Sequence, residues 1–158
     1  MTVRLQREDF DAAAEAAALT RGRTDVGAIV TFTGLCRGAE SGEPIAALTL
    51  EHYPGMTEAA LQDIAEQAHA RWRLLHTTIV HRVGTMAPTD QIVMVAVTSA
   101  HRGQSFQACE FLMDYLKTQA PFWKKEVTPE GARWVDARVS DDQALARWGI
   151  QASNAQGV

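Results

Sequence analysis

The run from Ile92 to Thr98 (IVMVAVT) constrains the fold most, because it is apolar at almost every position and rich in β-branched residues. A strand has this composition when both of its faces are buried, so we expect a central strand of a sheet here. Val26–Thr33, Ile45–Tyr53, His76–Val83 and Arg133–Val139 are further predicted strands, because they are rich in β-branched residues or alternate between apolar and polar. The chain therefore builds much of its core on β-structure.

Two helices are predicted in the first half of the chain. Asp9–Leu19 is rich in alanine with interspersed acidic residues, and we expect this helix to end at the Arg21-Gly22-Arg23 segment. Pro54-Gly55 stops the strand before the second helix, and Thr57 is a suitable N-cap for it. Its apolar residues recur at helical spacing: Ala60, Leu61, Ile64, Ala65, Ala68 and Trp72.

The second half contains two more predicted helices. Residues 104–117 form the first, with an inward face made of Phe106, Cys109, Met113 and Leu116. Pro121 disfavours an unbroken helix through Trp123, so the chain must turn near Lys117. Ser140 and Gln143 match a capping box for a last helix that ends near Trp148. The order is helix, two strands, helix, two strands, helix, strand, helix, which predicts an α+β or α/β sandwich.

Length, charge and cysteine content exclude several classes of protein. At 158 residues we expect one domain, residues 1–158, with a polar and flexible tail at 149–158. The net charge of −4 argues against binding to nucleic acid or to an anionic membrane through overall electrostatic attraction. The N-terminus has charges where a signal peptide needs an apolar run, and no segment approaches the ~18 apolar residues of a membrane span. Cys36 and Cys109 form no CxxC pair, so we expect a reducing, cytoplasmic location.

No metal site and no cofactor are expected. The histidines do not form a metal-binding spacing such as HExxH, and the chain has no glycine-rich phosphate loop of the GxxxxGK[ST] kind.

The densest clusters of reactive side chains follow the predicted central strand and the third helix. His101 and Arg102 stand just beyond the strand, where an arginine fork and a titratable imidazole can hold phosphate or carboxylate. The alternative is a surface pair without a ligand. Lys117 and Lys124 flank the turn at Pro121, which lets both amines face one pocket. Crowding and partial burial lower the pKa of a lysine toward the range of a nucleophile or base, although lysines near a helix end are often only solvated.

Two further arginines and one thiol are candidates for the same pocket. Arg37 projects from the loop after the first long strand, and Arg138 lies near the end of the last strand. Each can complete an anion site or simply lie at the surface. Cys36 is either a packing residue or a persulfide-carrying thiol, whose thiolate form the neighbouring Arg37 would favour.

Several segments resemble the large, catalytic subunit of molybdopterin synthase. They are VTFTG with Arg37 after it, LTLEHYPGMTE (Leu48–Glu58), VTSAHR (Val97–Arg102), MDYLKTQAPFWKKE (Met113–Glu126) and PEGARWVDAR (Pro129–Arg138). The segments stand in the family's order and span about residues 26–138. Cys36 departs from the pattern, which has an aliphatic residue there.

The resemblance implies an α/β-hammerhead-like, two-layer α+β fold with a mixed or antiparallel sheet. It implies a homodimer of large subunits within a heterotetramer, in which each binds a small ubiquitin-like sulfur-carrier subunit with a C-terminal Gly-Gly thiocarboxylate. The activity implied is a sulfurtransferase that inserts two sulfurs into cyclic pyranopterin monophosphate and forms the dithiolene of molybdopterin. No metal is required for this step.

By matching position, the resemblance makes Lys117 and Lys124 catalytic. It assigns the pterin and phosphate pocket to residues from both protomers, namely Arg37, His101, Arg102 and Arg138, with Phe32, Met113 and Glu126 nearby. Two alternatives remain: a persulfide sulfurtransferase that uses Cys36, and a non-enzymatic adaptor that only binds an anion.

Overall fold

The chain builds a mixed four-stranded sheet from segments that are distant in sequence. A computed structural model describes residues 1–135 and 139–149. The strand order is β1-β6-β8-β2, in which β1 and β6 are parallel and the other neighbours are antiparallel. The strands are β1 (Thr2–Gln6), β2 (Ala28–Leu35), β6 (Leu74–Arg82) and β8 (Gln91–Ser99).

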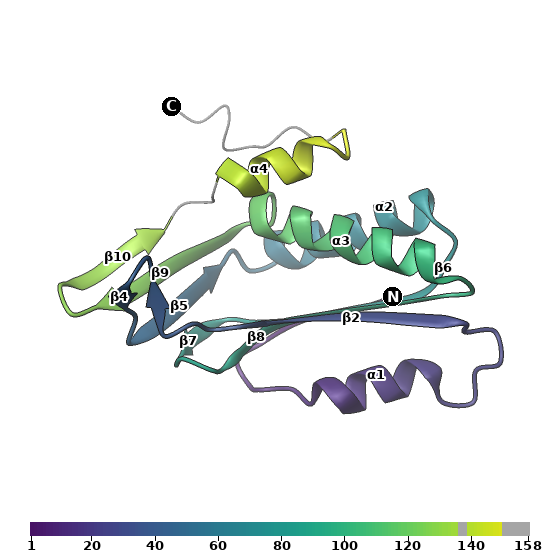
Figure 1. The fold of residues 1–158 in the computed structure, drawn as a ribbon, viewed down its shortest axis with the longest axis horizontal. Helices are drawn as coiled ribbons and strands as arrows, with labels where there is room; N and C mark the ends of the chain where they lie inside the picture. Colours follow the sequence, from purple (N-terminus) through teal and green to yellow (C-terminus); the bar gives the residue numbers. More distant parts are fainter. Residues whose placement is uncertain (136–138, 150–158) are drawn as a thin grey trace.

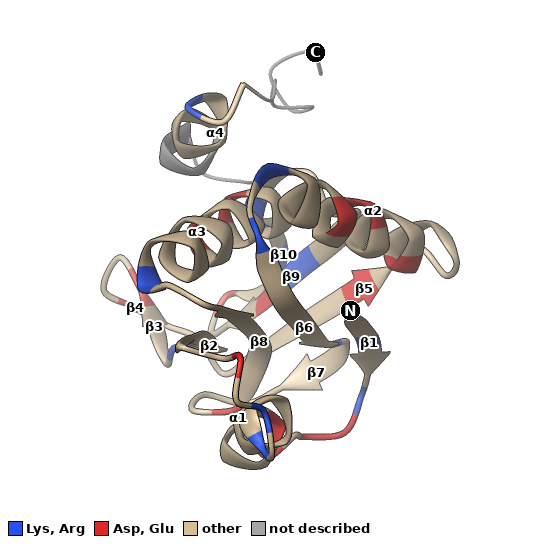
Figure 2. Ribbon diagram, turned by 90° about the vertical axis from the view of Figure 1, so that its right-hand side faces the viewer, with Lys and Arg blue, Asp and Glu red and all other residues tan. Residues whose placement is uncertain are grey.

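Helices cover both faces of this first sheet (Figure 1). The helices α2 (Met56–Arg71) and α3 (Arg102–Thr118) pack on one face, where Leu61, Ile64 and Phe111 are fully buried. The helix α1 (Ala12–Thr20) packs on the other face against Val80, Met94 and Ala96. The strand β8 is buried throughout residues 93–99 and has no charged residue (Figure 2), which confirms the predicted central strand.

A second, fully antiparallel sheet lies beside the first one (Figure 1). Its order is β10-β9-β5-β7, with β5 (Ala47–His52), β7 (Gly84–Met86), β9 (Phe122–Thr128) and β10 (Gly131–Val135). The chain passes from β6 to β7 at Gly84, whose φ of +91° suits glycine. A small hairpin of β3 (Ala39–Glu40) and β4 (Glu43–Pro44) follows β2.

The α+β class and the mixed sheet are confirmed, and α1 adds a layer beyond the two that were expected. The segment 2–6 was not predicted as a strand, although it forms β1 beside β6. The segment 122–128 was not predicted either, because its Lys-Lys-Glu sequence is not typical of a strand. It forms β9 because it pairs with β5 on one side and with β10 on the other. Local sequence patterns cannot reveal such long-range pairing.

Two predicted details are wrong. The N-cap of α2 is Gly55 rather than Thr57, because the Thr57 hydroxyl is used elsewhere. It accepts a hydrogen bond from the Tyr53 N–H and donates one to the Pro121 carbonyl, each at 2.9 Å, and so ties α2 to the end of α3. Phe106 is 60% exposed, so the inward face of α3 is instead made by Ala108, Phe111 and Leu112 together with Cys109 and Leu116.

The last elements are described only in part. The strand β10 ends at Val135, and α4 (Val139–Ala146) follows the predicted position of the last helix closely. Val139 begins α4, so the predicted strand 133–139 is too long at this end. Residues 136–138 and the tail from residue 150 lie outside the described residues, as do the side chains of residues 139–142, which include the Ser140 cap. Within the described part, no helix is long and apolar enough to cross a membrane.

Candidate active site

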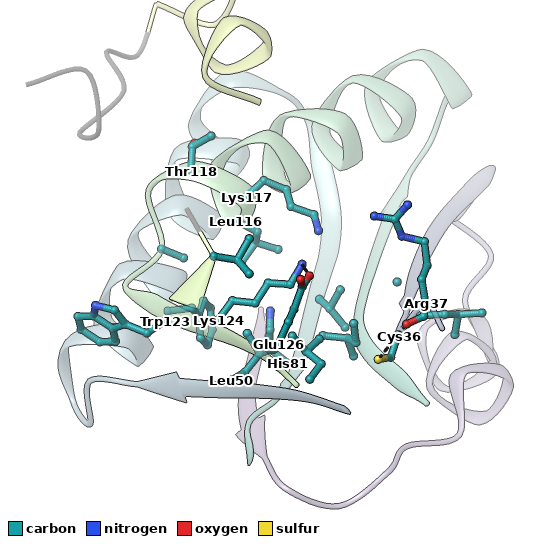
Figure 3. A pocket seen from close by; sticks show the side chains of 18 of the residues that line it. Cys36, Arg37, Leu50, His81, Leu116, Lys117, Thr118, Trp123, Lys124 and Glu126 are labelled. Carbon is teal, nitrogen blue, oxygen red and sulfur yellow. Dashed lines mark hydrogen bonds and ion pairs between the residues drawn. The ribbon is translucent and has the colours of Figure 1, made fainter. Parts of the chain in front are cut away.

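A cavity of about 710 Å³ lies between the C-terminal end of α3, the loop after β2 and one face of the second sheet (Figure 3). Its polar walls come from Arg37 and Glu40 near the small hairpin, Lys117 on α3, and Lys124 and Glu126 on β9. Apolar side chains of β5, including Leu48 and Leu50, form part of the floor. The cavity therefore combines an apolar base with a charged rim.

The turn at Pro121 brings Lys117 and Lys124 to this cavity, as the sequence predicts. The helix α3 ends at Thr118, with Gln119 as its C-cap, and β9 begins at Phe122. Alternation along β9 gives Lys124 and Glu126 the same face of the strand. Both lysine side chains point into the cavity in Figure 3.

A buried carboxylate connects Lys124 to the strand β10. Glu126 is 3% exposed, and its Oε1 lies 3.5 Å from Lys124 Nζ. Its Oε2 lies 3.4 Å from Arg133 Nη2, the side chain directly opposite on β10, and Arg133 also contacts Glu43 at 3.1 Å. A buried acidic side chain needs such partners, and two cations flank the Glu126 carboxyl group. Arg133 was not predicted as part of the site because its partner strand β9 was missed.

The loop after β2 contributes a cation and a protonated thiol. Arg37 lines the cavity and forms an ion pair with Glu40. The thiol of Cys36 is buried and donates a weak hydrogen bond to the Arg37 carbonyl. Burial, followed by the nearby Asp90 carboxylate, raises the pKa of Cys36. The expectation that Arg37 favours the Cys36 thiolate is therefore wrong, because the guanidinium pairs with Glu40 instead.

The other predicted residues are distributed over three places. Met113 lines the cavity, whereas Phe32 is 39% exposed on β2 and does not line it. His101 and Arg102 are exposed at the start of α3, a helix of 17 residues and thus about 25 Å long. Within one chain they are therefore separated from Lys117 by most of the length of this helix. Arg138 lies outside the described residues.

One buried histidine in the cavity wall was not singled out by the sequence. His81 on β6 is 7% exposed and lines the cavity together with Lys117 and Lys124. The alternating pattern of this strand predicts only that His81 is a core residue and does not indicate a place in the site. In the described part of the chain, no group of His, Cys, Asp and Glu side chains is arranged to hold a metal ion.

The cavity has the chemistry of an anion-binding site with reactive amines. Arg37, Lys117 and Lys124 bring three cations to it, against the carboxylates of Glu40 and Glu126. Cations in a partly enclosed, apolar-floored pocket favour an anionic ligand and stabilise negative charge that develops on it. Together, the two-sheet fold and this cavity define a protein that binds a small anionic ligand beside two amines.

The family model described as MoaE protein matches residues 5–119. A molybdopterin synthase catalytic subunit of Ralstonia nicotianae is 57% identical over 157 residues, which cover 99% of this chain and 89% of the relative. The chain belongs to the MoaE family of molybdopterin synthase catalytic subunits.

Solved structures agree with this assignment. The molybdopterin biosynthesis MoaE protein of Burkholderia ambifaria has a TM-score of 0.81 and 57% identity, with 95% of this chain and 99% of that chain covered. A chain of the Helicobacter pylori complex of subunits 1 and 2 of molybdopterin-converting factor shares the fold, with a TM-score of 0.71 and 16% identity. That match covers 86% of this chain and 91% of the other.

Proposed function

We propose that this chain transfers sulfur from a thiocarboxylated carrier protein to cyclic pyranopterin monophosphate and so forms the dithiolene of molybdopterin. Membership of the synthase family supports the reaction. The observation that carries the proposal for this chain is the convergence of Lys117 and Lys124 on one cavity beside a buried carboxylate. We infer a cytoplasmic location, which suits two buried, free thiols.

The two lysines divide the chemistry of the transfer. The thiocarboxylate sulfur bonds to the acceptor, and water then adds to the acyl carbon and cleaves the acyl–sulfur bond, which leaves the carrier with a C-terminal carboxylate. A cationic amine holds the thiocarboxylate and stabilises the oxyanion that forms when water adds. A second amine, in its neutral form, moves protons during the addition of sulfur to the acceptor. Glu126 fixes Lys124 within the cavity through its Oε1, while Arg133 occupies its other oxygen.

The carrier protein is proposed to dock at the mouth of the cavity. Trp123 and Trp134 line the cavity and are 46% and 57% exposed, and Tyr53 lies beside Trp123 with ring centroids 6.3 Å apart. Exposed aromatic side chains of this kind are enriched at protein interfaces. The two-subunit complex from Helicobacter pylori is a precedent for such an assembly within this fold.

A second copy of the chain is proposed to complete the pterin and phosphate site. His101 and Arg102 lie at the opposite end of α3 from Lys117, so one chain cannot bring them to its own cavity. A homodimer can bring the His-Arg pair of one protomer to the lysines of its partner. Phe32 of the edge strand β2 points to the face of the sheet that α3 covers, and Phe106 of α3 is also exposed. These two side chains define a β2–α3 apolar surface suited to this contact.

A single-turnover assay with thiocarboxylated carrier and pterin precursor tests the function. We expect the wild type to form dithiolene and Lys117→Ala or Lys124→Ala to lose about a hundredfold or more in rate, as expected when one catalytic group is removed. Lys125→Ala is the matched control, because Lys125 lies next to Lys124 on β9 but contacts the Trp134 ring instead of lining the cavity. It should retain near-normal activity.

Other outcomes identify the competing functions. Turnover that survives both lysine substitutions, with the ligand still bound, would indicate an adaptor that only binds an anion. Loss of turnover in Cys36→Ser would indicate persulfide chemistry, whereas the lysine mechanism predicts near-normal rates for this variant.

A further inference from the structure

His81 is a buried histidine in the cavity wall to which the proposed chemistry gives no role. It lies near the end of β6, opposite Val93 of β8, and lines the same cavity as Lys117, Lys124 and Glu126. Figure 3 shows its ring below the two lysines. Burying a polar ring here has a cost in free energy, which a smaller apolar residue in this strand would avoid.

The contacts of the ring define its tautomer. Nδ1 lies 2.8 Å from the Arg82 carbonyl oxygen, which can only accept a hydrogen bond, so Nδ1 carries the proton. In a neutral imidazole, Nε2 then has a free lone pair. The ring also stacks on Phe122, with centroids 4.1 Å apart and an interplanar angle of 20°. Two independent contacts therefore fix the direction of the Nε2 lone pair.

The charges around the ring keep it neutral. Lys117 of α3, Lys124 of β9 and Arg37 of the loop after β2 bring three cations to the cavity, against the carboxylates of Glu126 and Glu40. Glu126 is engaged by Lys124 and Arg133, and Glu40 by Arg37. Burial lowers the pKa of His81 to about 4, because it outweighs the hydrogen bond to the Arg82 carbonyl, which favours the protonated ring. The charge of Lys117 lowers this pKa further. At neutral pH His81 therefore brings a hydrogen-bond acceptor without adding a charge.

We propose that His81 is a positioning residue for Lys117: its Nε2 accepts a hydrogen bond from the Lys117 amine and directs that amine into the cavity. Lys117 is the charged group whose field acts on the ring, and both side chains line the same cavity. The inference rests on the proposed function, because it assumes that Lys117 acts on the substrate. The role requires the uncommon Nδ1-protonated form of the ring, which makes it testable apart from activity.

The first test is nitrogen-15 NMR of the histidine rings in the full-length protein. We expect the His81 ring to have a protonated Nδ1 and an unprotonated Nε2, and to remain neutral from pH 8 down to pH 5. An Nε2-protonated ring, or a ring that titrates near its usual pKa, would overturn the proposal. This measurement does not depend on turnover.

The second test compares His81→Phe with His81→Gln. Phenylalanine keeps the stacking on Phe122 but has no lone pair, whereas the glutamine amide can supply an acceptor near the position of Nε2. We expect kcat to fall about 10- to 100-fold in His81→Phe, the range that one hydrogen bond to a charged group accounts for, with KM changed less than threefold. His81→Gln should recover much of the loss. Equal losses in both variants would indicate a structural role and reject the proposal.

The acetylation rate of the Lys117 amine tests the role of His81 independently of the proposed sulfur transfer. Trace acetylation at pH 8, followed by peptide mass spectrometry, should show Lys117 reacting at least threefold faster in His81→Phe, because the ammonium form has lost an acceptor. Acetylation of Lys125 is the internal control. Unchanged Lys117 labelling would overturn the proposal even if the enzyme is active. An inactive wild type with the expected labelling would instead reject the proposed function alone.

Discussion

At the scale of single residues, the site depends on which side chains are charged inside the protein. The Glu126 carboxyl group is buried beside two cations, because Lys124 and Arg133 each contact one of its oxygens. His81 is neutral because burial and Lys117 oppose its protonation. The sequence showed Lys117, Lys124 and Glu126 as candidates, yet it gave no sign of Arg133 or His81. Their roles arise only from the strands and side chains that fold around them.

The low pKa of His81 predicts a loss of stability in mild acid. The pKa falls from 6.5 to about 4 on folding, so between these values the unfolded chain binds a proton that the folded chain does not. The stabilising effect is present above about pH 6.5 and is lost as the pH falls toward 4. We expect His81 to account for a decrease of about 2 kcal/mol in the free energy of unfolding between pH 7 and pH 5.

Denaturant unfolding at the two pH values checks this prediction. His81→Gln has no group that titrates there and should lose this part of the pH dependence. The pKa values of His69 and His76 are also lowered by burial, so a smaller dependence should persist in the variant. An equal decrease in wild type and variant would contradict the assignment to His81.

At the scale of elements, close contact between backbones determines where β2 and α3 lie. A Cβ atom added at Gly27 would lie 2.0 Å from the Ala100 carbonyl oxygen, and the Gly27 N–H bonds the Ser99 carbonyl at 3.1 Å. Ser99 in turn donates a hydrogen bond to the His101 carbonyl at 2.7 Å. The glycine thus allows β2 to approach the turn that presents His101 and Arg102.

Gly27→Ala is therefore expected to lower the free energy of unfolding by about 1–3 kcal/mol, the usual cost of overpacking, and to reduce synthase activity. Gly103→Ala is the matched control in the first turn of α3, where an added Cβ meets no atom within 4 Å. It should leave stability unchanged or raise it by up to about 1 kcal/mol, because alanine favours helix. Guanidinium unfolding curves compare the two, and equal stabilities would refute the role of this contact.

At the scale of the whole molecule, His101 and Arg102 lie at the opposite end of α3 from the cavity that Lys117 lines. The β2–α3 apolar surface lies along an edge strand of the first sheet, and edge strands with exposed apolar side chains are prone to associate. Association through this surface would remove its apolar area from water, and the proposed dimer requires that it also bring a His101-Arg102 pair to another protomer's cavity. The exposed apolar side chains on this edge therefore support the proposed dimer.

Phe106→Asp is predicted to prevent dimerisation through the proposed β2–α3 contact, because it places a charge on this apolar surface. Sedimentation velocity should show about half the wild-type mass, and circular dichroism should stay unchanged. Activity should fall, because the His101-Arg102 pair of a second protomer is lost from the cavity. Met56→Asp is the control, since Met56 is 57% exposed at the start of α2, away from β2. A dimeric, active Phe106→Asp protein would show that another surface joins the protomers.

The sequence by itself determined the central strand, the helices, the turn at Pro121 and the meeting of Lys117 with Lys124, because periodicity and proline act over short distances. The tertiary structure alone decided the rest. It paired β1 with β6 and placed β9 between β5 and β10, which brought Arg133 opposite Glu126. It also buried His81 beneath the amines and separated His101 from them along α3. These outcomes depend on contacts between residues far apart in the chain, which local sequence patterns do not predict.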